Sequence, residues 1–138
     1  MAQPARILAV DDERSVTELL RLILETAGYE VITTERSDEA ARWLAEPDRP
    51  FDLLVTDIRM GPIDGMELLR LAKRARPSLP VIMVTAYASE EAREEARRLG
   101  AGAYLGKPFS VAELLATIAR ELKRAAATPV PPAESPGA

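Results

Sequence analysis

Short runs of apolar, largely β-branched residues alternate along this chain with longer stretches in which apolar residues recur at helical spacing. Near-continuous apolar runs are typical of strands that are covered on both faces. Strands that alternate with helices favour a parallel sheet joined by right-handed crossovers, with helices on both faces. The sequence therefore predicts a doubly wound α/β fold, a three-layer sandwich of five βα units. The predicted strands cover residues 6–10, 30–34, 52–56, 80–85 and 102–106.

Several of the predicted helices carry their own start or stop signals. The first pattern ends at Gly28, a residue type that commonly terminates helices. The fourth begins at Ser89, with glutamates in its first turn and arginines in its last, which complements the helix dipole. The fifth begins with Ser110 and Glu113, the spacing of a capping box. The second and third helices are predicted at about 38–46 and 65–76.

The composition of the chain excludes several classes of function. There is no cysteine and no histidine, so the commonest zinc ligands and the commonest general base are absent. The net charge of −4 argues against nucleic-acid binding that is mainly electrostatic. The start of the chain, "MAQPARILAV", lacks the long apolar core of a signal peptide, and no stretch is long enough to span a bilayer. We expect a cytoplasmic protein without membrane insertion.

The end of the chain differs in composition from the rest. Residues 125–138 are rich in proline, alanine and serine, a composition that cannot bury a core. We expect a linker or a disordered tail there and one folded domain over residues 1–124, since 138 residues match the usual size of a single domain. The chain could be a protein in its own right or a domain cut from a longer protein at this linker.

Polar residues follow four of the five predicted strands. Asp11 and Asp12 follow the first strand, and Asp57 follows the third, directly after an apolar run. Thr85 ends the fourth strand, and Lys107 follows the fifth. Because the carboxyl ends of parallel strands meet at one edge of a sheet, these side chains are expected to lie close together. The second strand is followed by a glutamate and an arginine that look like ordinary surface residues.

A cluster of three carboxylates, a hydroxyl and an amine favours phosphoryl chemistry. Carboxylates about 4 Å apart repel by roughly 4 kcal/mol at an effective dielectric near 20, so they share protons or bind a divalent cation. All-oxygen ligands favour Mg²⁺. Asp57 would be the nucleophile that forms an aspartyl phosphate. Mg²⁺ and Lys107 would neutralise charge on the transferring oxygens.

Each of these residues also has an ordinary structural interpretation when it is taken alone. Asp11 and Asp12 could cap the helix that follows them, and Asp57 could cap a turn. Thr85 could be a strand residue with no further role. It is the coincidence of all these residues at one edge of the sheet that favours a functional site.

Four motifs occur in order on the predicted strands: "AVDDE", "LLVTDIRM", "VTAYAS" and "AYLGKPF". Together they resemble the receiver domain of bacterial two-component response regulators, over about residues 5–124. The resemblance implies a flavodoxin-like fold with strand order 2-1-3-4-5. It also implies a phosphorylation-dependent signalling switch, in which Asp57 accepts a phosphoryl group from a sensor histidine kinase or a phosphotransfer protein.

The resemblance implies a set of magnesium ligands. These are Asp11, Asp12, Asp57 and the backbone carbonyl of Arg59. The loop that carries Arg59 departs from the family pattern, which usually has proline directly after the methionine. Here the order is Gly61–Pro62. Because proline restricts the residue before it, this departure leaves the path of the loop open.

The resemblance also implies which residues transmit the signal. The hydroxyl of Thr85 would turn toward the phosphoryl group, and Lys107 would pair with that group. Tyr104 would change rotamer as Thr85 moves, although a half-buried packing aromatic is the ordinary interpretation. The bond between Lys107 and Pro108 would be cis, a feature that requires proline.

Arg59 and Tyr87 each lie two residues past a predicted site residue. Their side chains are expected to lie over the mouth of the pocket. Our hypothesis is that they limit the approach of water to the phosphoaspartate and so lengthen its lifetime.

Three functional classes remain open at this point. In a switch, the fourth helix, fifth strand and fifth helix would form a homodimer or bind a target protein. The domain would then catalyse only its own phosphorylation and dephosphorylation. A phosphatase or phosphotransferase with an aspartyl-phosphate intermediate would need a cap, and no insertion is long enough to form one. A pseudo-receiver would bind a partner without phosphorylation, and the complete set of acids, hydroxyl and lysine argues against it.

Overall fold

The computed structural model describes residues 3–86 and 88–127, which form five strands and five helices in strict alternation. The strands are β1 Arg6–Val10, β2 Glu30–Thr34, β3 Leu53–Thr56, β4 Val81–Thr85 and β5 Ala103–Gly106. The helices are α1 Arg14–Thr26, α2 Ser37–Leu44, α3 Gly65–Ala75, α4 Glu90–Arg98 and α5 Val111–Ala127.

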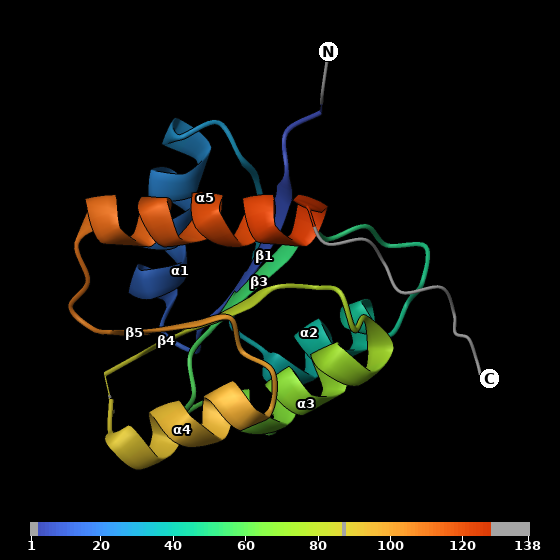
Figure 1. Cartoon of the computed structure of the whole chain (residues 1–138), viewed down its shortest axis with the longest axis vertical. Helices are drawn as coiled ribbons and strands as arrows, with labels where there is room; N and C mark the ends of the chain where they lie inside the picture. The colour runs from blue at the N-terminus through green and yellow to red at the C-terminus, as the bar shows by residue number, and fades with distance from the viewer. Residues whose placement is uncertain (1–2, 87, 128–138) are drawn as a thin grey trace.

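All strands pair in parallel in the order β2-β1-β3-β4-β5. Helices α1 and α5 cover one face of the sheet, and α2, α3 and α4 cover the other (Figure 1). The predicted three-layer α/β sandwich and its strand order are therefore confirmed.

The sheet divides the core in two, and this division explains the near-continuous apolar strands. In β1, Leu8 and Val10 pack toward α2 and α3, whereas Ile7 and Ala9 pack toward α1 and α5. Successive side chains of a strand point to opposite faces. A strand with helices on both sides is therefore apolar at most of its positions.

The predicted helix signals lie where the helices begin and end. Gly28 and Gly100, which follow α1 and α4, have φ angles of 99° and 107°. This left-handed conformation is accessible to glycine without steric cost. Ser89 Oγ accepts a hydrogen bond from Ala92 N at 3.1 Å at the start of α4. Among the helices of the described ranges, none combines the length and apolar character that a bilayer-spanning segment needs.

Some boundaries differ from the predicted ones. The third, fourth and fifth strands each begin one residue later than predicted, at Leu53, Val81 and Ala103. Helix α5 runs to Ala127 and so includes residues 125–127, which were predicted to belong to the tail. These residues are alanines, the strongest helix formers, and they continue the helix. The rest of the predicted tail, 128–138, lies outside the described residues.

Candidate functional site

Three charged side chains meet at the carboxyl edge of the sheet. Asp11 follows β1, Asp57 follows β3, and Lys107 follows β5. Lys107 Nζ donates to Oδ2 of Asp11 at 2.7 Å and to Oδ2 of Asp57 at 3.1 Å. The two carboxylates are buried, with exposed fractions of 2% and 7%. The predicted convergence of strand ends thus places one ammonium between two carboxylates.

The second oxygen of each carboxylate accepts a backbone hydrogen bond. Asp11 Oδ1 accepts from Glu13 N at 2.9 Å, and Asp57 Oδ1 accepts from Ile58 N at 2.6 Å. The turn-capping interpretation and the site interpretation therefore apply to the same residues. The backbone contacts fix the orientation of each carboxylate, while the other oxygen faces the shared lysine.

Burial and charge act against each other within the cluster. Burial raises the pKa of the Asp11 carboxyl, and hydrogen bonds from Lys107 and Glu13 offset only part of this effect. Burial alone would lower the pKa of Lys107, but Asp11 and Asp57 outweigh it and raise that pKa. One ammonium between two buried carboxylates leaves an excess of negative charge. A cation would neutralise this excess.

The acidic cluster fits a hard divalent cation. Asp11, Asp12 and Asp57 each offer an oxygen, and these oxygens lie within 4.8 Å of one another. Asp12 is exposed, so that the cluster opens toward solvent on its side. Oxygen ligands with room for water suit Mg²⁺, which keeps part of its hydration shell. Arg59, whose carbonyl is the fourth implied ligand, lines the same shallow hollow as Asp12.

Thr85 lies beside this cluster, and Tyr104 lies deeper in the molecule. Thr85 is fully buried at the end of β4, and its carbonyl accepts a hydrogen bond from Lys107 N at 2.8 Å. Tyr104, on the neighbouring strand β5, is 8% exposed and packs in the core beneath α4. Its hydroxyl has no hydrogen-bond partner among the described residues. The guanidinium of Arg93 lies 5.0 Å from its ring centroid.

The other predicted residues are placed as follows. The peptide bond between Lys107 and Pro108 is cis. Arg59 is exposed at the wall of the hollow. Tyr87 lies outside the described residues, so that its predicted place over the pocket stays a prediction.

Two residues that touch the site loop were not predicted from the sequence. A Cβ on Gly65, the first residue of α3, would overlap the carbonyl oxygen of Asp57 and lie 2.7 Å from Ile58 Cα. Ser37, the first residue of α2, accepts a hydrogen bond from Ile63 N. For Gly65 a signal existed, since a glycine directly after the helix-capping Asp64 is a poor helix former. For Ser37 the sequence offers no such signal.

Comparison with known proteins gives a consistent match. The sequence profile of the family described as "Response regulator receiver domain" matches residues 7–119. The alkaline phosphatase synthesis transcriptional regulatory protein PhoP of Bacillus subtilis (strain 168) is 38% identical over 119 residues, which are 86% of this chain and 49% of PhoP. The chain thus spans about half the length of this curated relative.

Solved structures agree with this match. A response regulator receiver domain protein from Methanospirillum hungatei JF-1 superposes with a TM-score of 0.84 at 35% identity, covering 89% of this chain and 97% of that one. The beryllofluoride-activated NtrC4 receiver domain, a dimer in solution, superposes with a TM-score of 0.80 at 35% identity. That match covers 87% of this chain and 98% of the other.

Proposed function

Because the chain belongs to the family of response regulator receiver domains, we propose that it is a phosphorylation-controlled switch whose Asp57 accepts a phosphoryl group. The donor would be a sensor histidine kinase or a phosphotransfer protein. The observation that carries the proposal is the Lys107 ammonium, which bonds Asp11 and Asp57 next to the exposed Asp12. A nucleophile, a cation site and a counter-charge for a phosphoryl group are thereby joined in one cluster.

The proposed reaction is a single phosphoryl transfer. A carboxylate oxygen of Asp57 forms a bond to phosphorus, and the bond from phosphorus to the donor's imidazole nitrogen breaks. The imidazole leaves with the electron pair and takes up a proton from solvent. Water later attacks the phosphoaspartate and releases inorganic phosphate, which regenerates the carboxylate. The domain thus catalyses only its own phosphorylation and dephosphorylation.

The residues of the cluster would share the work of this transfer. Asp11, Asp12, Asp57 and the Arg59 carbonyl would hold Mg²⁺, which supplies positive charge to the phosphoryl oxygens. Lys107 would exchange its bond to Asp57 for a bond to a phosphoryl oxygen.

Thr85 and Tyr104 would convert phosphorylation into a change of surface. The Thr85 hydroxyl would donate to the phosphoryl group and so shift the end of β4. Tyr104 would report this shift, because a buried hydroxyl without a partner is costly and an outward rotamer would hydrate it. The phosphoryl group would thus change the balance of two conformations that both exist beforehand.

The α4–β5–α5 face would form the output surface. Helix α4 consists mainly of glutamate and arginine, which suits a reversible contact that weakens with salt. A second copy of this chain or a target protein would bind there. The dimer of the activated NtrC4 receiver domain supports the first of these partners.

Acetyl phosphate, Mg²⁺ and intact mass measurement test the proposal. The wild-type chain should gain the mass of one phosphoryl group, and chelation of Mg²⁺ should prevent the gain. Asp57→Asn should gain nothing, whereas the matched control Asp48→Asn, at an exposed carboxylate outside the cluster, should behave as wild type. Continuous release of phosphate from a separate substrate would favour an aspartyl-phosphate enzyme instead. Absence of any adduct in the wild-type chain would favour a pseudo-receiver.

A further inference from the structure

The loop between β3 and α3, residues 57–64, is held by a hydrogen bond from a distant part of the chain. Ser37, which begins α2, is 1% exposed, and its Oγ accepts a hydrogen bond from Ile63 N at 3.0 Å. Serine at a helix start usually caps its own helix. Here the N-cap residue of α2 is Arg36, without a side-chain cap. The Ser37 hydroxyl therefore serves the loop after Asp57 instead of its own helix.

Further contacts fix the loop on either side of Arg59. Gly65 N donates to Ile58 O at 2.6 Å, which closes the base of the loop. The sulfur of Met60 lies 3.8 Å from Thr56 Oγ1. The side chains of Ile58, Met60 and Ile63 all pack against the core on the α2–α3 side of the sheet. The backbone of Arg59 is thus held between anchored neighbours.

The remaining part of the loop has little to hold it locally. Gly61 and Pro62 are exposed, and a Cβ on Gly61 would meet nothing within 4 Å. Glycine has the largest conformational freedom of any residue, so its position must be fixed by contacts elsewhere. The hydrogen bond from Ile63 N to Ser37 lies directly after this segment and provides such a contact.

The same corner of the fold also supports Asp11. The carbonyl of Thr34, at the end of β2, accepts a hydrogen bond from Asp11 N at 3.3 Å. Thr34 Oγ1 accepts from Arg36 N at 3.1 Å and donates to Glu39 Oε1 at 2.6 Å. The β2–α2 corner, residues 34–37, is therefore bonded both to the strand end that carries Asp11 and to the loop that follows Asp57.

We propose that Ser37 is a positioning residue for the metal and phosphoryl site, acting through Ile63 on the loop that presents the Arg59 carbonyl. The inference rests on the proposed function, because it concerns the magnesium site of the same cluster. Ser37 would touch neither the phosphoryl group nor the ion. It sets the position of one ligand by holding the loop on which that ligand lies, as outer groups of metal sites commonly do.

The test compares Ser37→Ala with a matched loss of a buried hydroxyl elsewhere. Thr117→Ala is the control, because Thr117 is 5% exposed and its Oγ1 donates to Glu113 O at 2.7 Å within α5, on the other face of the sheet. In Ser37→Ala the backbone amide of Ile63 should exchange with solvent about tenfold faster. The dissociation constant for Mg²⁺, measured by calorimetry without a phosphodonor, should rise about threefold to tenfold. Groups bonded directly to a ligand typically change affinity by about 10- to 100-fold.

Phosphorylation by acetyl phosphate provides a second readout. Its rate in Ser37→Ala should fall at low Mg²⁺ and return to the wild-type rate at saturating Mg²⁺, since the nucleophile itself is unchanged. Ser37→Thr, which keeps a hydroxyl, should restore both the Mg²⁺ affinity and the protection of the Ile63 amide. If Ser37→Ala unfolds, Ser37→Cys takes its place, because a thiol is a weaker acceptor and should give the same faster exchange and weaker Mg²⁺ binding.

Each other outcome overturns the inference. If the Ile63 amide exchanges faster but Mg²⁺ affinity matches that of Thr117→Ala, the Ser37 contact is merely structural. If the Ile63 amide keeps its protection in Ser37→Ala, the hydrogen bond does not hold the loop. If the wild-type chain itself binds no Mg²⁺, the proposed function fails and this inference fails with it. This failure can be told apart from the other two, because the Mg²⁺ titration of the wild-type chain reveals it before any variant is made.

Discussion

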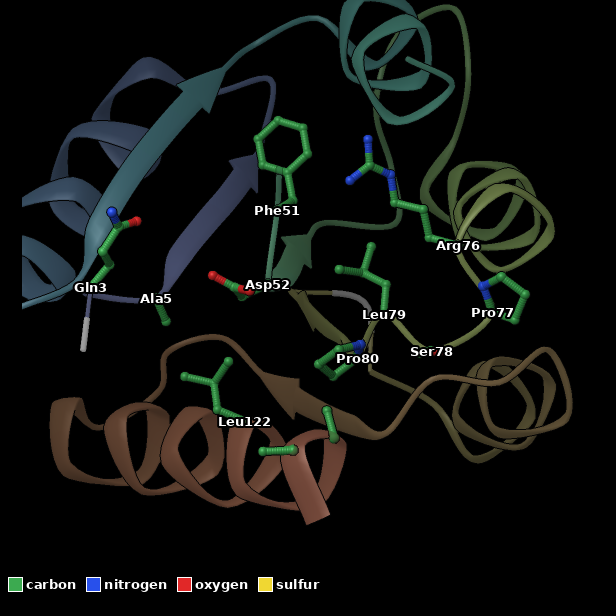
Figure 2. Close-up of a pocket in the computed structure, with 12 residues that line it drawn as sticks. Gln3, Ala5, Phe51, Asp52, Arg76, Pro77, Ser78, Leu79, Pro80 and Leu122 are labelled. Atoms are coloured by element: carbon green, nitrogen blue, oxygen red, sulfur yellow. The ribbon is translucent and has the colours of Figure 1, made fainter. Parts of the chain in front are cut away.

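The carboxyl ends and the amino ends of the strands form two opposite edges of the sheet, and these edges use charged side chains in opposite ways. At the carboxyl edge, Asp11 and Asp57 are buried and share the single ammonium of Lys107. At the opposite edge, the pocket shown in Figure 2 contains Arg76, whose guanidinium lies 5.3 Å from the ring centroid of Phe51. Both edges therefore hold partly or fully buried charge, but the partners of that charge differ.

The partners of Arg76 are backbone carbonyls at the end of α2. Its Nε donates to Leu44 O at 2.9 Å, and its terminal nitrogen donates to Glu46 O at 2.7 Å and to Trp43 O at 3.4 Å. The Trp43 and Glu46 carbonyls also accept backbone hydrogen bonds, from Glu46 N and Arg49 N, both at 3.1 Å. Arg76 adds charged donors at this helix end, where a cation complements the helix dipole. Charge at this edge stabilises the fold, whereas charge at the carboxyl edge is left in excess. An excess of buried negative charge is therefore the feature that distinguishes the carboxyl edge as the candidate functional site.

The largest effect is expected from Gly65→Ala at the carboxyl edge. The new Cβ would overlap the carbonyl oxygen of Asp57, so the backbone must shift, and we expect a loss of about 3 kcal/mol in the free energy of unfolding. Urea denaturation measures this loss. Gly61→Ala in the same loop is the control, because its Cβ would meet nothing within 4 Å. Equal stabilities of the two variants would show that the start of α3 is not closely packed against the backbone of Asp57.

At the opposite edge, Arg76→Ala should destabilise the fold without affecting the chemistry. It removes charge-assisted hydrogen bonds to the end of α2, and we expect a loss of about 2 kcal/mol. Thermal unfolding measures the loss, and Arg74→Ala on the exposed side of α3 is the control. The rate of phosphorylation by acetyl phosphate should stay at the wild-type value. A slower rate would show that Arg76, at the opposite edge, also affects the cluster at the carboxyl edge.

Asp11→Asn should raise the free energy of unfolding, whereas the two preceding substitutions lower it. The pKa of Asp11 is raised because burial disfavours its ionised form, so the folded state binds the proton more tightly than the unfolded state. The ionised carboxylate therefore destabilises the fold at neutral pH. Its removal leaves Lys107 paired with Asp57, and we expect a gain of about 1 kcal/mol in the absence of Mg²⁺.

Urea denaturation without divalent cations measures the gain for Asp11→Asn. The gain should shrink as the pH is lowered, because the wild-type carboxyl then takes up a proton. Asp12→Asn is the control, since Asp12 is exposed and its loss relieves no burial. A loss of stability at neutral pH in Asp11→Asn would show that Lys107 outweighs burial and that the carboxyl edge is as well balanced as the opposite one.

The smallest effect is expected from Arg59→Ala. Its side chain is exposed at the wall of the hollow, where it would limit the approach of water to the phosphoaspartate. We expect autodephosphorylation to become about threefold faster, which corresponds to about 0.6 kcal/mol. Decay of the phosphorylated mass measures the rate, with Arg70→Ala on α3 as the control. An unchanged rate in both Arg59→Ala and Tyr87→Ala would rule out the role that their positions predict.

The sequence was most informative where local periodicity and topology carry the signal. The apolar strands, the glycine after α1 and the rule that strand ends meet at one edge were enough to predict the fold and to bring Asp11, Asp57 and Lys107 together. The β2–α2 corner, by contrast, looked like ordinary surface. Its contact with Ile63 joins the first residue of α2 to an irregular loop 26 residues away, and no periodicity encodes the path of that loop. The caps made by Arg76 at the end of α2 are of the same kind.

The ammonium of Lys107 bonds to Asp11 and Asp57, which lie 96 and 50 residues earlier in the chain. During synthesis, the strands that carry both aspartates leave the ribosome well before β5 does. Asp57, the proposed nucleophile, is therefore made before the lysine that completes the cluster. Under the proposed function, the complete cluster would form only once β5 is made, so that an unfinished chain would lack the lysine that pairs with the phosphoryl group.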